Sequence, residues 1–506
     1  MSQTDYQGKL DEFRKYIRKI KHYEEAVGLI YWDLRTGAPK KGMNERSEVI
    51  GELSTEAFKL SVSDEMGEYL DYFTEPDHQQ QLDETNQRIV GEAKKEYDRS
   101  KKIPPAMYQE YVVLTSQAES KWEEAKETSD FAMFQPYLEK IVNTNLKFVE
   151  LWGYEGHKYN TLLDMYEPGM TVEKLDEVFS ALRQEVVPLL AEIQKAEKPD
   201  RSFLRQKFDA AKQKQFSLFI LKELGYDFEA GRLDETVHPF ATGLNPGDVR
   251  ITTRYLPEDA TSALFGTIHE CGHALYEQNI SPDLIGTNLC TGTSMGIHES
   301  QSRFWENMVG RSREFWSRYY GDLQRTFPGQ LDDVSEDAFY RAVNHTEPSL
   351  VRIEADELTY NLHIMIRYEI EKGLLSGEFT VADLPQVWNA KYREYLGVEP
   401  DNDAEGVLQD VHWAGGSFGY FPSYALGNMY AAQFAHTLRQ EIPQFDELLA
   451  KGDFAPIKEF LSEHIYKYGK SQTPNEIIRR VTGEDLNPQY LVDYLKDKYK
   501  PLYGLS

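Results

Sequence analysis

The chain has 506 residues, 40% of them hydrophobic and 13% aromatic, so it can bury a large core, and its length permits roughly two to four domains. Its formal net charge is −28 at pH 7, with no basic stripe to neutralise phosphates, which excludes nucleic acid as a partner. No apolar run approaches the length of a membrane span, and residues 1–10 lack the apolar region of a signal peptide. Cys271 and Cys290 are interpreted as free thiols, and together these features predict a cytoplasmic protein.

Helical patterns dominate the first 224 residues. Apolar residues recur at three- and four-residue steps from Leu10 to Tyr31, which predicts a long amphipathic helix. Proline and glycine mark the boundaries of the helical segments that follow. These segments are residues 46–73, 84–100, 105–126, 131–152, 172–196 and 202–224.

The pattern changes between residues 225 and 257, which are rich in turn residues. Residues 249–255 alternate and are β-branched, so we expect a small antiparallel β-sheet directly before the next helix. From Ala260 onward the pattern is again mainly helical. Because there is no low-complexity linker and no clear repeat, we expect two lobes of one mainly α-helical body and not independent domains.

The most informative segment is residues 262–278, which contain His269-Glu270-Cys271-Gly272-His273. On a helix, residues four apart share a face, so the two histidines can offer imidazole nitrogens to one metal ion. Glu270 can then reach a metal-bound water, as in zinc peptidases. Glycine costs about 1 kcal/mol relative to alanine inside a helix, so Gly272 predicts a very close neighbour.

A catalytic zinc site also needs a third protein ligand and one open position. Glu299, in a predicted helix over residues 294–306, is the best candidate, and His298 and Glu306 are the alternatives. Glu277 follows His273 at helical spacing, but on a rigid helix it would overshoot the ion.

One class of zinc peptidase is excluded by the residues that follow the motif. In metzincins a glycine and then a third histidine come shortly after the second metal ligand. Tyr276 and Asn279 occupy those positions here. The third ligand must therefore come from elsewhere in the chain.

Donors for the oxyanion of a tetrahedral intermediate are available in residues 406–424, a glycine-rich segment. It contains His412, Tyr420 and Tyr424, each of which can donate a hydrogen bond. The chain has 32 tyrosines, so a purely structural role is the alternative for each of these residues.

Two arginines are candidates for binding substrate. Arg352 can hold a substrate carboxylate as a fork, and the alternative is a surface salt bridge. Arg250 is the second candidate, with pairing to Asp248 as its alternative. The strand that carries Arg250 can also receive a peptide by edge pairing.

Six ordered motifs between positions 238 and 413 resemble those of the M32 family of metallocarboxypeptidases, which includes thermostable bacterial and archaeal enzymes. The total length also fits that family, and the one small departure is Val351, where the family usually has Ile or Asn. The motifs are His238-Pro-Phe240, Asp248-x-Arg-x-Thr252, His269-Glu-x-x-His273, His298-Glu-Ser-Gln301, Arg352-x-x-Ala-Asp356 and Gly406-x-x-Gln-Asp-x-His-Trp413.

The resemblance implies a metal site and a reaction. Zinc, or alternatively cobalt, is expected on His269, His273 and Glu299, with Glu270 as general base and then proton donor. The expected reaction is removal of C-terminal residues from peptides with broad specificity, and a homodimer is common in the family. Arg352 would hold the terminal carboxylate.

The family is similar to angiotensin-converting enzyme and neurolysin, which implies one two-lobed catalytic domain over residues 1–506 with a deep groove. Residues of about 1–100 would form a lid, and residues of about 225–430 the metal-site core. By the same similarity His238 contacts the substrate backbone, while His412 and either Tyr420 or Tyr424 stabilise the oxyanion.

Two other functions fit the same sequence. The first is an endo-oligopeptidase with the same metal site, which would cut peptides with an amidated C-terminus. The second is a non-catalytic, helical peptide-binding protein with a structural metal. Only the resemblance of Arg352 and its motif favours a carboxypeptidase over the first of these.

Overall fold

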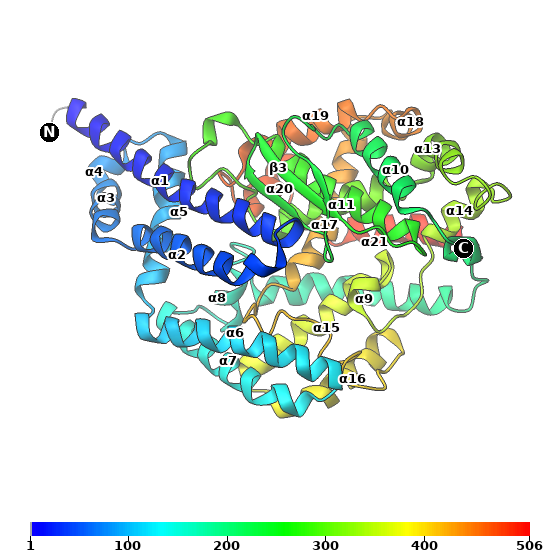
Figure 1. Ribbon diagram of the computed structural model, residues 1–506, viewed down its shortest axis with the longest axis horizontal. Coiled ribbons are helices and arrows are strands. Elements are labelled where there is room, and N and C mark those ends of the chain that lie inside the picture. Colours follow the sequence, from blue (N-terminus) through cyan, green and yellow to red (C-terminus); the bar gives the residue numbers. More distant parts are fainter. Residues whose placement is uncertain (1–2, 506) are drawn as a thin grey trace.

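The computed structural model describes residues 3–505, and it is mainly helical, as the sequence predicts (Figure 1). In the first half of the chain the long helix α1 (Gln3–Thr36) packs against α2 (Met43–Ser61). The helices that follow are α3 (Asp64–Thr74), α4 (Pro76–Gln79), α5 (Glu84–Lys101), α6 (Pro105–Thr128), α7 (Phe131–Trp152), α8 (Tyr159–Leu163), α9 (Val172–Ile193) and α10 (Ala210–Glu223).

Two predicted helices are interrupted by capping residues. The segment 46–73 divides into α2 and α3 because the Ser63 side chain accepts the Met66 N–H and so starts a new helix. The segment 202–224 begins with the 3₁₀ turn Ser202–Arg205, and α10 starts only after Asp209, whose carboxylate caps it. In both cases a local side-chain acceptor outweighs the continuing apolar pattern.

The small sheet has three strands, β1 (Leu233–Glu235), β2 (Ala241–Asn245) and β3 (Asp248–Thr253), in the order β1-β3-β2. The pair β2–β3 is antiparallel, as predicted, but β1 pairs with β3 in parallel, so the sheet is mixed and not purely antiparallel. Alternation along a strand shows which face is buried and does not show the direction of the neighbouring strand.

The remaining helices build the rest of the body around α11 (Ala260–Gln278) and α12 (Met295–Arg303), and α12 continues into the π-helix Phe304–Val309. Asp259 caps α11 and Ser294 caps α12. The later helices are α13 (Arg313–Thr326), α14 (Glu336–Val343), α15 (Glu357–Ser376), α16 (Leu384–Leu396), α17 (Pro422–Glu441), α18 (Phe445–Lys451), α19 (Ala455–His464), α20 (Pro474–Thr482) and α21 (Gln489–Leu502).

In Figure 1 the sheet, α10 and α11 occupy the upper part of the molecule, α6 and α7 lie below, and α1 and α2 lie across the left side. Helix α11 packs against β3 on one side and against α12 on another, and α12 also packs against α17. Helices α15 and α17 are buried along most of their length. Among residues 3–505, no helix is long and apolar enough to cross a membrane.

The packing of α12 against α11 and α17 depends on two glycines. A Cβ atom at Gly272 would lie 2.5 Å from the carbonyl oxygen of Gln301 and 2.5 Å from Cα of Ser302. A Cβ atom at Gly427 would lie 2.5 Å from Cγ of Glu299. The close neighbour that Gly272 predicts is therefore the backbone of α12. Helices α11 and α17 both contact α12 at a glycine, where the absence of a side chain allows the close approach.

Replacing Gly272 by alanine should push α12 away from α11, because the contact is with backbone atoms that cannot rotate aside. We expect Gly272→Ala to lower the free energy of unfolding by about 1–3 kcal/mol in urea denaturation, the usual cost of overpacking. Gly266→Ala in the same helix is the control, since no atom lies within 4 Å of its Cβ position, and it should be neutral or stabilising by up to about 1 kcal/mol. Equal effects of the two substitutions would contradict the packing argument.

Candidate active site

Three residues from two helices converge at one point. Helix α11 presents His269 and His273, and α12 presents Glu299. The Nε2 atoms of the two histidines lie 3.7 and 3.5 Å from Oε2 of Glu299, and the three ligand atoms all lie within 4.8 Å of one another. Among the described residues, these three form the one group of His, Cys, Asp or Glu side chains arranged to hold a metal ion. We call His269, His273 and Glu299 the metal group.

The second ring nitrogen of His269, Nδ1, contacts Glu306 on the π-helix. This Nδ1 atom lies 2.9 Å from Oε2 of Glu306. The carboxylate of Glu306 is itself paired with Arg303, at 3.5 Å, and with Arg311, at 3.3 Å. The sequence left Glu306 open as an alternative third ligand. In the structure it contacts instead the ring nitrogen of His269 that faces away from Glu299.

His298, the other alternative ligand, occupies the corresponding place beside His273. Its Nδ1 lies 2.6 Å from Nδ1 of His273, and its Nε2 lies 2.8 Å from Oε1 of Glu277. Both histidines of the motif therefore have their Nδ1 atoms engaged and their Nε2 atoms directed toward Glu299.

The protonation states of His273 and Glu299 suit metal binding. Burial lowers the pKa of His273 to about 4, so its ring is neutral, the form that binds a metal. Although burial opposes ionisation, the guanidinium of Arg303 and the two histidines hold the pKa of Glu299 well below its ordinary value. Nε of Arg303 donates to Oε1 of Glu299 at 2.7 Å, leaving Oε2 on the side of the histidines.

Glu270 is 7% exposed and lies between the two histidines in the sequence of α11. Burial raises its pKa to about 7, against the opposing charge of His269 and with the help of Glu299 and Glu306. A carboxyl group that titrates near neutral pH can both accept and donate a proton, which is what a general acid–base catalyst requires.

The structure brings His412 together with both candidate tyrosines. Nε2 of His412 lies 3.2 Å from the hydroxyl of Tyr424, and the ring centroids of His412 and Tyr420 are 5.4 Å apart. Burial raises the pKa of Tyr420 to about 12 and that of Tyr424 well above its ordinary value, and the charge of Glu299 adds to both shifts. Both hydroxyls therefore stay protonated and can donate hydrogen bonds.

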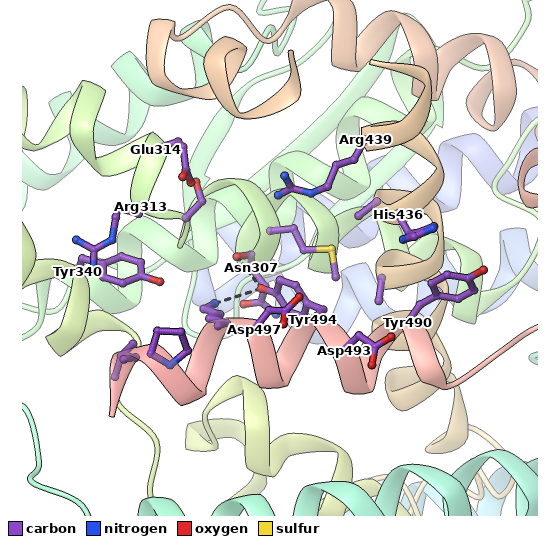
Figure 2. A pocket seen from close by; sticks show the side chains of 17 residues that line it. Asn307, Arg313, Glu314, Tyr340, His436, Arg439, Tyr490, Asp493, Tyr494 and Asp497 are labelled. Carbon is purple, nitrogen blue, oxygen red and sulfur yellow. Dashed lines mark hydrogen bonds between the residues drawn. The ribbon is translucent and has the colours of Figure 1, made fainter. Parts of the chain in front are cut away.

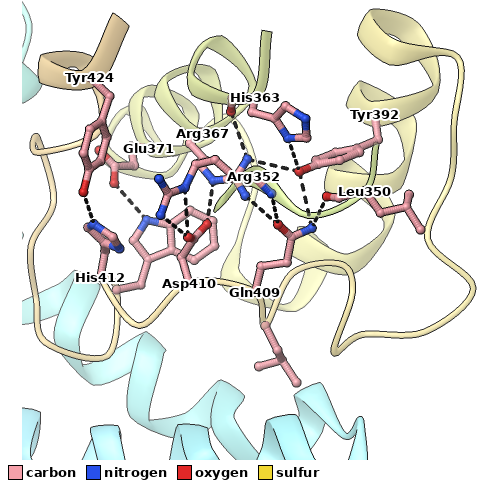
Figure 3. Close-up of polar contacts among 12 residues, drawn as sticks. Leu350, Arg352, His363, Arg367, Glu371, Tyr392, Gln409, Asp410, His412 and Tyr424 are labelled. Atoms are coloured by element: carbon pink, nitrogen blue, oxygen red, sulfur yellow. Dashed lines mark hydrogen bonds and ion pairs between the residues drawn. The ribbon is translucent and has the colours of Figure 1, made fainter. Parts of the chain in front are cut away.

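Arg352 lies in the same cluster and is 6% exposed (Figure 3). Its Nε and Nη2 donate to Oδ1 of Asp410 at 3.0 and 2.8 Å, and its Nη1 donates to the hydroxyl of Tyr360 at 3.0 Å. Oδ2 of Asp410 accepts from Nε of Arg367 at 2.6 Å. The surface salt bridge that the sequence offered as an alternative is thus a buried pair, and Cζ of Arg352 lies 5.0 Å from the centre of the Tyr424 ring.

The two other predicted substrate contacts lie on the small sheet or beside it. His238 is exposed, on a bend between β1 and β2. Arg250 forms the pair with Asp248 that was its alternative interpretation, with bonds of 2.7 and 2.8 Å, and stacks over Trp32 of α1. Edge pairing of a peptide with β3 is wrong, because β3 is the central strand and both its edges are occupied.

A separate cavity of about 540 Å³ lies between α13, α14, α17 and α21 (Figure 2). None of the metal group lines it. Its cations are paired with neighbouring side chains, as in Arg313 with Asp337 and Lys498 with Glu357. The arginine and lysine side chains that line this cavity therefore offer no free positive charge around which to build a second site.

Comparison with known proteins identifies the family. The family model described as "Carboxypeptidase Taq (M32) metallopeptidase" matches residues 12–499. The chain belongs to the M32 family. It is therefore a metal-dependent peptide hydrolase of the carboxypeptidase type, and the comparisons support neither the endo-oligopeptidase nor the non-catalytic binding protein.

Relatives of this M32 chain match over nearly their whole length. "Carboxypeptidase 1" of Bacillus subtilis (strain 168) is 55% identical over 495 residues, 98% of each chain. "Thermostable carboxypeptidase 1" of Thermus thermophilus is 41% identical over 97% of this chain and 98% of that one. The crystal structure of the M32 carboxypeptidase from Deinococcus radiodurans R1 has a TM-score of 0.96 at 37% identity, covering 98% of this chain and all of that one.

Asp410 and Arg367 are site residues that sequence reasoning did not single out. Asp410 stands two residues before His412 inside a recognised motif, so its signal was present. Arg367 carries no comparable signal, because it lies within a helical pattern 43 residues before its partner. Only the fold brings the two side chains into contact.

Removing the charge of Asp410 should destabilise the fold. We expect Asp410→Asn to lower the free energy of unfolding by about 3–5 kcal/mol, because two buried guanidinium groups, Arg352 and Arg367, lose their counter-charge. The control is Asp446→Asn, which removes an exposed pair with Arg439 and should cost less than about 1 kcal/mol.

The loss of stability in Asp410→Asn should depend on pH. Although burial opposes ionisation, Arg367 and Arg352 hold the pKa of Asp410 well below its ordinary value. The folded state therefore binds fewer protons than the unfolded state, and the stabilisation is present above about pH 4 and is lost as the pH falls below it. Urea denaturation at several pH values should show the difference between wild type and Asp410→Asn shrinking below about pH 4. A difference that grows in acid would contradict the assignment.

Proposed function

We propose that His269, His273 and Glu299 bind one divalent metal ion, zinc with cobalt as an alternative, and that the site removes C-terminal residues from peptides with broad specificity. The supporting observation is the convergence of two Nε2 atoms and one carboxylate oxygen. Ligand atoms about 2.0–2.1 Å from a tetrahedral ion lie about 3.3 Å apart. The distances of 3.5 and 3.7 Å from Oε2 of Glu299 to the two nitrogens fit that arrangement.

When bound, such an ion polarises a carbonyl group and lowers the pKa of water. The protein's own contribution to bond cleavage is a base, a proton donor and hydrogen bonds to the carbonyl oxygen. Glu270 accepts the proton of the attacking water and then passes it to the leaving amine, a role that its buried carboxyl group suits. Burial also keeps bulk water from competing for the same proton.

The carbonyl oxygen is held from the other side by His412 and a tyrosine. Burial lowers the pKa of His412 to about 4, so the ring is neutral and has one N–H to donate. Tyr420 and Tyr424 are both protonated and both contact His412, and we assign the second donor to this pair.

Arg352 binds the carboxylate of the terminal residue. A guanidinium has five N–H groups, and the bonds to Asp410 and Tyr360 use three of them. One N–H remains on each terminal nitrogen, which is the pair that a carboxylate fork needs. Asp410 fixes the plane of that fork.

The arrangement of the whole chain is also part of the proposal. We infer one catalytic domain over residues 1–506, with residues of about 1–100 covering a groove that leads to the metal. Contacts of α1 with the sheet support this, since Asn245 donates to Glu25 at 3.0 Å and Thr236 donates to the carbonyl oxygen of Arg35 at 3.0 Å. From the family resemblance we also propose a role for His238 on the substrate backbone and a homodimer. The two free cysteines, Cys271 and Cys290, support the proposal of a cytoplasmic location.

Glu270→Gln tests the general base. The amide keeps the shape of the side chain and cannot accept a proton, so we expect metal content to be unchanged and kcat to fall by about 10²–10⁴-fold. Metal content is measured by atomic absorption, and kcat is measured on a blocked dipeptide with a free C-terminus. Activity within tenfold of wild type would show that another group removes the proton.

Arg352→Lys tests the carboxylate fork. Lysine keeps the charge and loses the planar, bidentate geometry, so we expect kcat/KM on a peptide with a free C-terminus to fall by about 10-fold to 10²-fold. Mass spectrometry of the digested peptide should show stepwise loss from the C-terminus, and the amidated form of that peptide should remain intact with either enzyme. Internal cleavage of the amidated peptide by wild type would contradict the exopeptidase assignment.

A further inference from the structure

The Nδ1 atoms of the two histidines of the metal group have different partners. Nδ1 of His269 meets the carboxylate of Glu306 directly, at 2.9 Å. Nδ1 of His273 meets a second imidazole instead, that of His298, at 2.6 Å, and that ring continues to Oε1 of Glu277 at 2.8 Å. At His273 a second imidazole therefore stands between the metal-binding histidine and a carboxylate, whereas at His269 the carboxylate is met directly.

The direction of the hydrogen bonds from His273 through His298 to Glu277 follows from the last member of this series. A carboxylate only accepts hydrogen bonds, so Nε2 of His298 carries the proton that points to Glu277. In the tautomer with its one proton on Nε2, His298 accepts at Nδ1, and the contact of 2.6 Å then takes its proton from Nδ1 of His273. With Nδ1 protonated, Nε2 of His273 has its lone pair free and directed toward Glu299.

Glu277 is itself firmly placed. Its Oε1 also accepts the backbone N–H of Gly292 at 2.9 Å, and its side chain is 12% exposed. A Cβ atom at Gly243 of β2 would lie 3.0 Å from Oε2 of Glu277, so the strand packs closely against the carboxylate. Thr291 makes only a long contact with Oε1, at 3.4 Å.

The ring of His298 is confined as well. A Cβ atom at Gly292 would lie 2.5 Å from its Cδ2, and the ring centroid of Tyr276 is 5.1 Å away. The imidazole therefore cannot turn to present other atoms to its two partners without moving the segment around Gly292.

We propose that Glu277 is a positioning residue of the metal site, which acts through His298 to fix the tautomer and the orientation of His273. The inference rests on the proposed role of His273 as a metal ligand. Glu277 lies one helical turn after His273 on α11 and does not reach the ion's position itself, because His298 stands between them. Partners of this kind raise the affinity of histidine ligands for a metal.

The test is a double-mutant cycle on metal affinity, measured on the full chain by competition with a chelator for zinc. Glu277→Ala and His298→Ala should each weaken zinc binding by about 10-fold to 10²-fold. Because Glu277 acts through His298, the double variant should bind zinc no more than about twofold more weakly than His298→Ala alone. The visible spectrum of the cobalt-loaded enzyme should also change in Glu277→Ala, since it reports the ligand geometry.

Two further variants separate this role from a merely structural one. Thr291→Val removes another contact of Glu277 and should leave zinc affinity unchanged. Glu277→Gln keeps an acceptor oxygen for Nε2 of His298 and should lose less affinity than Glu277→Ala; if the alanine variant does not fold, the cycle is run with glutamine.

The proposal is overturned if Glu277→Ala binds zinc as wild type does, if its effect persists fully in the His298→Ala background, or if Thr291→Val weakens binding equally. Failure of the metal assignment gives a different result. If His273 is not a metal ligand, His273→Ala would bind zinc with the same affinity as wild type.

Discussion

The close approach of α12 to α11 and α17 is the constraint on which the rest of the site depends. Gly272 and Gly427 let two helices meet α12 at distances where no Cβ atom fits. Because Glu299 lies at that contact, its carboxylate is placed opposite the two histidines of α11. A looser contact would leave the same residues on the same helices without bringing the three ligand atoms within 4.8 Å of one another.

Much of the buried charge around this contact is tolerated because it is paired. Arg303 binds Glu299 and stacks over the ring of Tyr360, at 4.4 Å, and Tyr360 accepts a hydrogen bond from Arg352. Arg352 then pairs with Asp410. The metal group and the predicted carboxylate fork are thus two ends of one connected set of side chains, which places them at a fixed separation.

Much of the fold could be predicted from local sequence, because helices are set by periodicity and by capping residues such as Asp259 and Ser294. The direction of β1 could not, since it depends on which edge of β3 the chain returns to. The helical spacing of His269 and His273 predicted that they share a face, and both Nε2 atoms do point to Glu299. Sequence alone did not exclude His298 or Glu306 as the third ligand, because that choice depends on how α12 and the π-helix lie against α11.

The most direct test of this account is a crystal structure of the zinc- or cobalt-loaded protein, with the ion located by anomalous scattering. The account predicts one ion about 2.0–2.2 Å from Nε2 of His269, Nε2 of His273 and a carboxylate oxygen of Glu299. An ion bound instead through His298 or Glu306, or none at this point in metal-saturated crystals, would contradict it.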